Sequence, residues 1–195
     1  MSKNKNLLIA GNWKMNGSRR SLSIVSLLMK YIKTKKFKNT HVLICPPFTL
    51  INSFATLAKR SKLMVGAQDC SNKALGAYTG EVSPSMLVDV GSQAVILGHS
   101  ERREYHNESN KLIHDKVSNA LGTDLLTIVC LGESLFQKKR GNTLRVIGEQ
   151  LRKSLPDNIN VKNIVIAYEP IWAIGSGLIP ENDDIYKVHH FISQK

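Results

Sequence analysis

The sequence predicts an α/β fold built around a parallel sheet. Short apolar runs typical of buried strands alternate along the chain with longer segments whose apolar residues recur at helical spacing. The strand-like runs are continuously apolar, as expected for parallel strands that helices cover on both faces. Six such strand–helix units follow one another at intervals of roughly 30 residues. This pattern leaves two architectures open, an open doubly wound sheet and a closed barrel of strand–helix units.

The predicted elements follow from these two periodicities. In chain order, the predicted strands are Leu7–Ala10, His41–Cys45, Leu63–Val65, Ala94–Leu97, Leu125–Leu131 and Asn163–Ala167. The predicted helices are Ser21–Lys36, Phe48–Lys59, a short helix that Ser83 opens and Gly91 closes, Asn107–Leu121, Thr143–Leu155 and Asp183–Gln194. The first helix shows the rule, because Leu22, Val25 and Ile32 fall on one face of it. In the third, Ser83 is a capping residue and Pro84 stands in the first turn.

Length and composition predict one domain with a sizeable core. The chain has 195 residues, of which 42% are hydrophobic. No apolar run reaches the roughly 18–20 residues of a membrane span, so we expect no membrane partner. Cys45, Cys70 and Cys130 are far apart and odd in number, which argues against a disulfide framework or a zinc site. Reduced thiols are typical of the cytoplasm, and no metal-ligand spacing occurs elsewhere.

The formal net charge of +12 is the unusual compositional feature. Lysine and arginine gather at Lys30–Lys38 and Lys138–Arg140, with few aromatic residues among them. Basic patches bind nucleic-acid phosphates, so a nucleic-acid-binding protein is one interpretation. We favour solvated helix ends and loops instead, and therefore expect no nucleic-acid partner. A positive field would also steer a small anionic substrate.

Polar residues gather after the predicted strands. They are Asn12 and Lys14, Gln68 and Asp69, His99 to Glu101, Glu133, and Glu169. In parallel strand–helix folds the carboxyl ends of the strands form one rim, where loops and helix N-termini converge on a ligand. Five strands that supply polar groups to one rim predict a binding or catalytic site there.

Three of these residues suggest acid–base chemistry. Glu169 follows a buried strand between apolar neighbours and fits a base, although an ion-paired structural glutamate would look the same in sequence. His99 precedes Ser100, which we expect to cap a helix; the positive helix end would keep the imidazole neutral. Lys14 supplies a fixed cation. A base together with two electrophilic groups is suited to removing a proton from the carbon next to a carbonyl.

Four motifs together resemble the triosephosphate isomerase family. They are Ala10–Asn16 (AGNWKMN), Gly98–Arg103 (GHSERR), Cys130–Glu133 (CLGE) and Tyr168–Gly177 (YEPIWAIGSG), and they stand in the order and spacing of that family. The resemblance covers essentially the whole chain. It implies a TIM-type (β/α)₈ barrel that interconverts dihydroxyacetone phosphate and D-glyceraldehyde 3-phosphate through an enediolate, without a cofactor, in glycolysis and gluconeogenesis.

The resemblance also implies roles for individual residues. Glu169 would abstract the carbon-bound proton, and His99 would protonate and deprotonate the enediolate oxygens. Lys14 and Asn12 would hold the substrate and stabilise charge, and Gly175 would give a backbone N–H to the phosphate when its loop closes.

The family resemblance further implies a partner. The segment Gln68–Glu81 resembles the loop that reaches into the partner subunit of a cytoplasmic homodimer, which would place Thr79 close to the neighbour's site.

The printed sequence supplies six of the family's eight strand–helix units. We expect residues 1–195 to be a single, incomplete TIM-barrel domain, with the glycine-rich loops of the last two units absent and kcat/KM lowered as a result. Two further interpretations stay open. The chain could be one piece of a split enzyme, or an inactive remnant or anion- or nucleic-acid-binding protein on the same scaffold. An open barrel would also leave two strand edges unpaired.

Overall fold

The structure of the protein is a computed structural model that describes residues 7–35, 39–157 and 161–195. It contains one sheet of six strands in the order β1-β2-β3-β4-β5-β6, and every pair is parallel. The strands are β1 (Leu7–Asn12), β2 (Thr40–Cys45), β3 (Leu63–Ala67), β4 (Ala94–Leu97), β5 (Leu126–Leu131) and β6 (Ile164–Tyr168). Sequence neighbours are sheet neighbours throughout. This order excludes the doubly wound sheet, in which the strand order reverses at a switch point.

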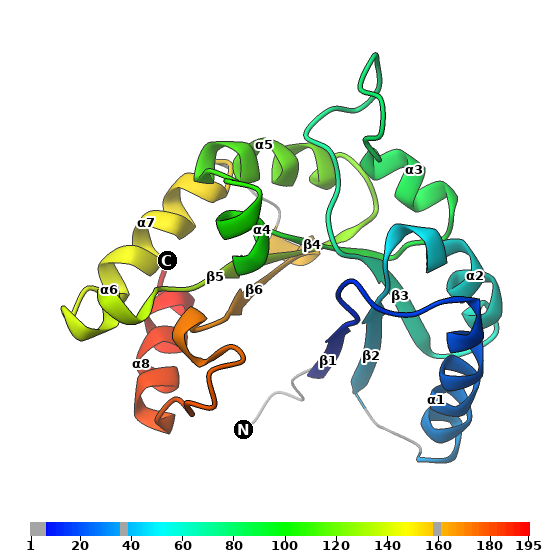
Figure 1. Ribbon diagram of the computed structural model, residues 1–195, viewed down its shortest axis with the longest axis horizontal. Helices are drawn as coiled ribbons and strands as arrows, with labels where there is room; N and C mark the ends of the chain where they lie inside the picture. The colour runs from blue at the N-terminus through cyan, green and yellow to red at the C-terminus, as the bar shows by residue number, and fades with distance from the viewer. Residues whose placement is uncertain (1–6, 36–38, 158–160) are drawn as a thin grey trace.

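The sheet curls into an arc, and the helices lie along its outer side (Figure 1). They are α1 (Leu22–Thr34), α2 (Phe48–Ala58), α3 (Pro84–Asp89), α4 (Ser100–Tyr105), α5 (Asn110–Leu121), α6 (Leu135–Lys139), α7 (Thr143–Ser154) and α8 (Asn182–Ser193). Three short 3₁₀ turns are η1 (Arg19–Ser21), η2 (Val161–Asn163) and η3 (Ile171–Ala173). The arrangement is a barrel that is open between β1 and β6.

Two apolar layers explain why the strands are continuously hydrophobic. The inner layer joins Leu43, Cys45, Ala94, Ile96, Ile128 and Cys130. The outer layer packs the alternate strand residues, such as Val129 and Leu131 of β5, against the helices. Because successive side chains of a strand point to opposite faces, both faces of β5 are buried. The apolar runs therefore predict the strands but not which strands are neighbours.

Some observed helices differ from those predicted from the sequence. The predicted helix Asn107–Leu121 starts three residues later, because Asn107 has a φ of 52° and the Ser109 side chain caps the helix by accepting from Leu112 N. Helix α6 was not predicted, because its five residues are too few to show a helical repeat. Lys36, the last residue of the first predicted helix, lies outside the described residues.

Strands β1 and β6 are the two ends of the sheet, and in the described ranges each pairs with one neighbour only. Leu8 packs into the inner layer, whereas Leu7 and Ile9 on the other face are 56% and 50% exposed. The two open edges predicted for six strand–helix units are thus present. No helix within 7–35, 39–157 and 161–195 is both long and apolar enough for a membrane span.

Candidate active site

The loop that follows β1 holds Lys14 in a strained conformation. The backbone of Lys14 has a φ of 53°, a region that residues other than glycine rarely occupy. The side chain of Asn12 accepts a hydrogen bond from Lys14 N at 2.9 Å, and Gln68 Nε2 donates to Lys14 O at 2.9 Å. The same Gln68 group donates to Cys45 O at 2.7 Å. Asn12 and Gln68 therefore fix the backbone from which the Lys14 ammonium projects to Glu101 Oε1, 2.6 Å away.

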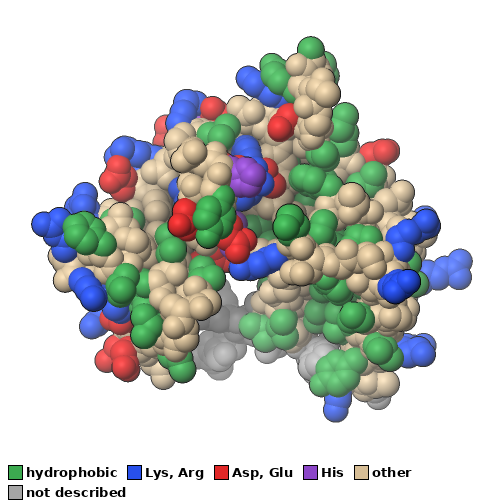
Figure 2. Space-filling view, viewed as in Figure 1, with side chains coloured by type: hydrophobic (Ala, Val, Ile, Leu, Met, Phe, Trp, Pro, Cys, Tyr) green, Lys and Arg blue, Asp and Glu red, His purple; other side chains and the backbone are tan. Residues whose placement is uncertain are grey.

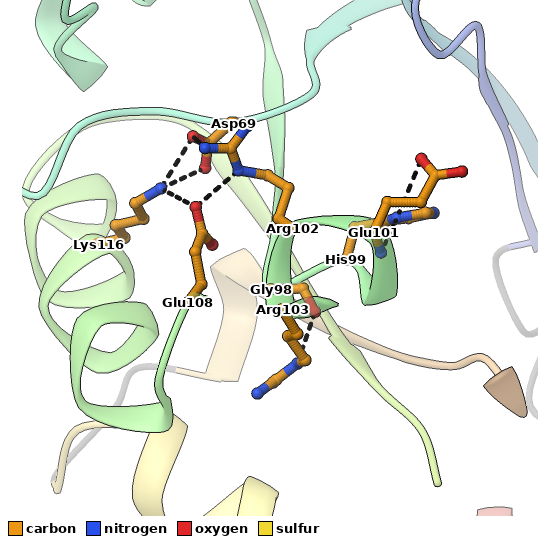
Figure 3. Close-up of polar contacts among 8 residues, drawn as sticks. All are labelled: Asp69, Gly98, His99, Glu101, Arg102, Arg103, Glu108 and Lys116. Carbon is orange, nitrogen blue, oxygen red and sulfur yellow. Dashed lines mark hydrogen bonds and ion pairs between the residues drawn. The ribbon is translucent and has the colours of Figure 1, made fainter. Parts of the chain in front are cut away.

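His99 sits at the carboxyl end of β4 as the N-cap of α4, with its side chain 8% exposed. Its Nδ1 accepts a hydrogen bond from the backbone N–H of Glu101 at 3.2 Å (Figure 3). A ring nitrogen that accepts carries no proton, so a neutral His99 carries its proton on Nε2. The prediction that Ser100 caps this helix is wrong, because the imidazole itself takes that place. The cap thereby fixes the tautomer of the ring.

Glu169 follows β6, and its backbone N–H donates to Leu131 O at 2.8 Å. Its side-chain Oε2 is buried and accepts no hydrogen bond from the described residues. That oxygen lies 3.6 Å from His99 Nε2, too far for a hydrogen bond. A Cβ at Gly132 would come within 2.0 Å of Glu169 O, so this approach of β5 to β6 requires glycine there. Glu169 Oε2 is thus an unpaired carboxylate oxygen beside an imidazole N–H.

The thiol beneath this carboxylate is not a nucleophile. Burial raises the pKa of Cys130 well above its usual value, and the neighbouring Glu169 charge raises that pKa further. Burial also raises the pKa of Cys45 to about 12. Both thiols are free and remain protonated at neutral pH. Cys130 therefore contributes packing under Glu169 rather than chemistry.

A cavity of about 310 Å³ lies between the loop after β1 and the first residues of α4. Asn12, Lys14, Gln68 and His99 line it, together with Arg102 and Tyr105. Glu169 adjoins it through the contact with His99. Gly175 is not brought to this group, because it stands in an exposed loop where a Cβ would meet nothing within 4 Å. Charged and histidine side chains gather around a hollow at the centre of the face in Figure 2.

The start of the loop that carries Gly175 is anchored on a buried carboxylate. Glu133 is fully buried, and it accepts hydrogen bonds from Trp172 Nε1 at 2.9 Å and from Tyr168 OH at 3.1 Å. Its carbonyl oxygen accepts from Ile171 N at 3.2 Å. Burial and the Glu133 charge together raise the pKa of Tyr168, which keeps the phenol a donor. Glu133 thus holds both the end of β6 and the turn η3 that follows Glu169.

A buried ion cluster supports the helix that carries His99 (Figure 3). Lys116 Nζ contacts Asp69 at 2.8 Å and Glu108 at 2.6 Å, and Arg102 contacts the same two carboxylates at 2.9 and 2.6 Å. Burial raises the pKa of Asp69. Burial also opposes the charge on Glu108, but Lys116 and Arg102 outweigh it and lower that pKa. The cluster ties α4 to α5 and to the loop after β3.

A family model described as triosephosphate isomerase matches residues 7–195. The chain belongs to the triosephosphate isomerase family. The triosephosphate isomerase of Rhizobium meliloti (strain 1021) is 46% identical over 188 residues, which are 96% of this chain and 73% of that protein. That of Bradyrhizobium sp. (strain ORS 278) is 45% identical and covers 96% of this chain and 74% of its own length.

A solved structure supports the same conclusion for the fold. The crystal structure of triosephosphate isomerase from Bartonella henselae superposes with a TM-score of 0.87 and 37% sequence identity. The match covers 96% of this chain and 74% of that one. The chain therefore has the TIM-type barrel fold of the triosephosphate isomerase family. It spans about three quarters of the length of these relatives.

Sequence reasoning assigned no role to three contributors to this site. Gln68 was noted only as a polar residue after β3, Glu133 only as one after β5, and Trp172 only as part of a motif. No local pattern shows that Gln68 reaches Lys14, since 54 residues separate them. In the described ranges, no group of three or more His, Cys, Asp or Glu side chains is arranged to hold a metal ion.

Proposed function

We propose that Glu169, His99 and Lys14 carry the reaction of the family in this chain, the interconversion of dihydroxyacetone phosphate and D-glyceraldehyde 3-phosphate. The observation that supports this most directly is the unpaired Glu169 Oε2 that faces His99 Nε2 at 3.6 Å. This buried oxygen accepts no hydrogen bond from the described residues and is ready to accept a proton. The Nε2–H beside it is ready to donate a hydrogen bond to a carbonyl oxygen.

The proposed reaction is a proton transfer at carbon. Glu169 removes the proton next to the carbonyl, and the electron pair of that C–H bond forms the enediolate. His99 Nε2–H hydrogen-bonds the carbonyl oxygen, gives it a proton and recovers one from the neighbouring hydroxyl. Glu169 then returns its proton to the adjacent carbon. Lys14, oriented by Asn12 and Gln68, stabilises the negative charge that develops on oxygen.

The loop that carries Gly175 completes the proposed site. Gly175 has a φ of 67° and no side chain, so its backbone N–H can approach a phosphate closely. Closure of the loop would bring this N–H to the substrate and exclude water from the enediolate. Gly175 and Asn12 are therefore proposed as substrate-binding residues, and no step needs a cofactor.

The test is turnover of dihydroxyacetone phosphate in D₂O, followed by ¹H NMR and by a coupled dehydrogenase assay. Proton abstraction by a carboxylate that exchanges with solvent predicts deuterium at the carbon next to the carbonyl as well as net isomerisation. Glu169→Gln should abolish both signals. A soluble, folded chain without turnover or exchange would contradict the proposal and favour an inactive remnant.

We also propose a homodimer formed through the segment Gln68–Glu81. This segment projects from the body of the molecule between β3 and α3 (Figure 1). Leu75 and Tyr78 on it are 83% and 46% exposed. Exposed apolar side chains on a projecting loop are typical of a surface that a partner covers. The three free, buried cysteines support placing this enzyme in the cytoplasm.

Leu75→Glu should weaken the dimer by roughly ten- to a hundredfold in Kd, because it places a charge in the centre of the proposed contact. Sedimentation velocity over a range of concentrations measures this change. Leu27→Glu is the matched control, since Leu27 on α1 is also exposed, at 65%, but lies away from the loop. A wild-type chain that stays monomeric at tens of micromolar would contradict the dimer.

A further inference from the structure

Lys138 differs from the other residues of the basic cluster Lys138–Arg140. Its side chain is 29% exposed, whereas the exposed Lys139 beside it forms no ion pair among the described residues. The Lys138 ammonium lies 4.2 Å from the centre of the Trp172 ring, and it also forms an ion pair with Asp184. Its charge is therefore engaged inside the molecule and is not a free contact for a phosphate backbone.

The two partners of Lys138 stand at the two ends of one loop. Trp172 belongs to η3, which precedes the segment Ile174–Glu181, and Asp184 lies in the first turn of α8, which follows it. Between these ends the loop is exposed, with Ile179 87% exposed. One ammonium on α6 thus contacts both flanks of the loop that carries Gly175.

Trp172 is held from two directions. Glu133 accepts the hydrogen bond of its Nε1 at 2.9 Å and so fixes the edge of the ring, while Lys138 lies over the face. An ammonium over an indole face is the strongest of the common cation–π pairs. If Trp172 moves together with the start of the loop, its contact with Lys138 must therefore break, or Lys138 must move with it. Asp184 links that same ammonium to the end of the loop.

From this geometry we propose that Lys138 is a positioning residue that clamps both ends of the loop Ile174–Glu181 and sets how readily the loop opens and closes. The proposal rests on the function proposed above, in which Gly175 of that loop contacts the substrate phosphate. Lys138 acts through Trp172 and Asp184 and touches no substrate itself.

Amide hydrogen exchange of the full chain tests the clamp without requiring turnover. The amides to follow are those of Ala173, Ile174 and Ile185, which are hydrogen-bonded at the two flanks. Lys138→Met keeps the aliphatic stem and removes the charge. It should raise exchange at these amides by roughly three- to thirtyfold, the range that loss of a cation–π contact gives.

Three further variants sharpen the result. Lys139→Met removes a charge from the adjacent position and should leave exchange within about twofold of wild type. Lys138→Arg keeps a cation that can stack on indole and pair with a carboxylate, so it should restore protection. Asp184→Asn should raise exchange at Ile185 more than at Ala173, because it releases only the α8 end.

The fluorescence of Trp172 gives a second readout that a merely structural role would not move. In a Trp13→Phe background, Lys138→Met should shift the emission and increase quenching by acrylamide, and Lys138→Arg should not. Where the chain turns over substrate, Lys138→Met should raise KM more than it lowers kcat, whereas Glu169→Gln should lower kcat. The clamp is overturned if Lys138→Met matches Lys139→Met, or if it raises exchange equally throughout the chain.

Discussion

Glu169→Gln is expected to lower kcat by about 10²–10⁴-fold, the contribution of a positioned general base. Glutamine keeps the size and the hydrogen-bonding oxygen of the side chain but cannot take a proton from carbon. The wild-type carboxylate faces His99 Nε2 at 3.6 Å, and its Oε2 has no hydrogen-bond donor among the described residues, so the substitution removes the base without breaking a hydrogen bond that this oxygen accepts. The coupled dehydrogenase assay measures the loss.

Glu169→Asp provides a graded version of the same experiment. Shortening the side chain by one methylene keeps the base but withdraws the carboxylate by about 1 Å, which can cost on the order of 10²-fold in rate. Glu149→Gln is the matched control, because Glu149 lies on α7 with its side chain 42% exposed and paired with Lys153. If Glu169→Gln stays within threefold of the control, the base is another group and the proposed chemistry is wrong.

Glu108→Gln is expected to destabilise the fold by about 3 kcal/mol, the cost of removing one partner from a buried ion pair. The Glu108 side chain is 1% exposed and accepts from both Lys116 and Arg102 at 2.6 Å. Without this charge, the buried Lys116 and the partly buried Arg102 share the single carboxylate of Asp69. Urea denaturation followed by far-ultraviolet circular dichroism measures the free energy of unfolding.

The destabilisation caused by Glu108→Gln should become smaller at low pH. The folded chain lowers the pKa of Glu108 below its usual 4.5, so the stabilisation is present above that pH and is lost as the pH falls through the folded value. The gap between wild type and Glu108→Gln should therefore shrink below about pH 4.5. The control Glu104→Gln changes an exposed carboxylate on α4, two residues after Arg102 and outside the cluster, and it should cost less than about 0.5 kcal/mol. A gap that widens on acidification would contradict this account.

The distribution of basic side chains argues against a nucleic-acid-binding surface. On the face in Figure 2, Lys and Arg side chains stand at several separate places around the margin, and on the left acidic side chains lie among them. Lys138 of the second basic cluster is paired with Asp184 and stacked on Trp172. Arg140 lies 4.9 Å from the ring of Phe136, on its own helix. The positive charge is therefore spread over helix ends, as a solvated basic surface would be.

The sequence by itself determined the alternation of strands and helices and the identity of the family. The strand β5 could be predicted from its apolar run because both of its faces are buried, so consecutive residues must be apolar. The motifs around Lys14, His99 and Glu169 are readable for a similar reason. Each lies within a few consecutive residues at the end of one strand, where backbone and side chain must fit together.

Only the tertiary structure decided which distant residues meet. Alternating units fit either a doubly wound sheet or a barrel, and the sequential strand order became known only from the pairing of β1 to β6. The support of Lys14 by Gln68 and the contact of Lys138 with both ends of the loop depend on groups brought together by that curvature. Hydrogen bonds and ion pairs act over about 3–4 Å in space, whatever the separation in sequence. Such contacts therefore leave no periodic signal in the chain.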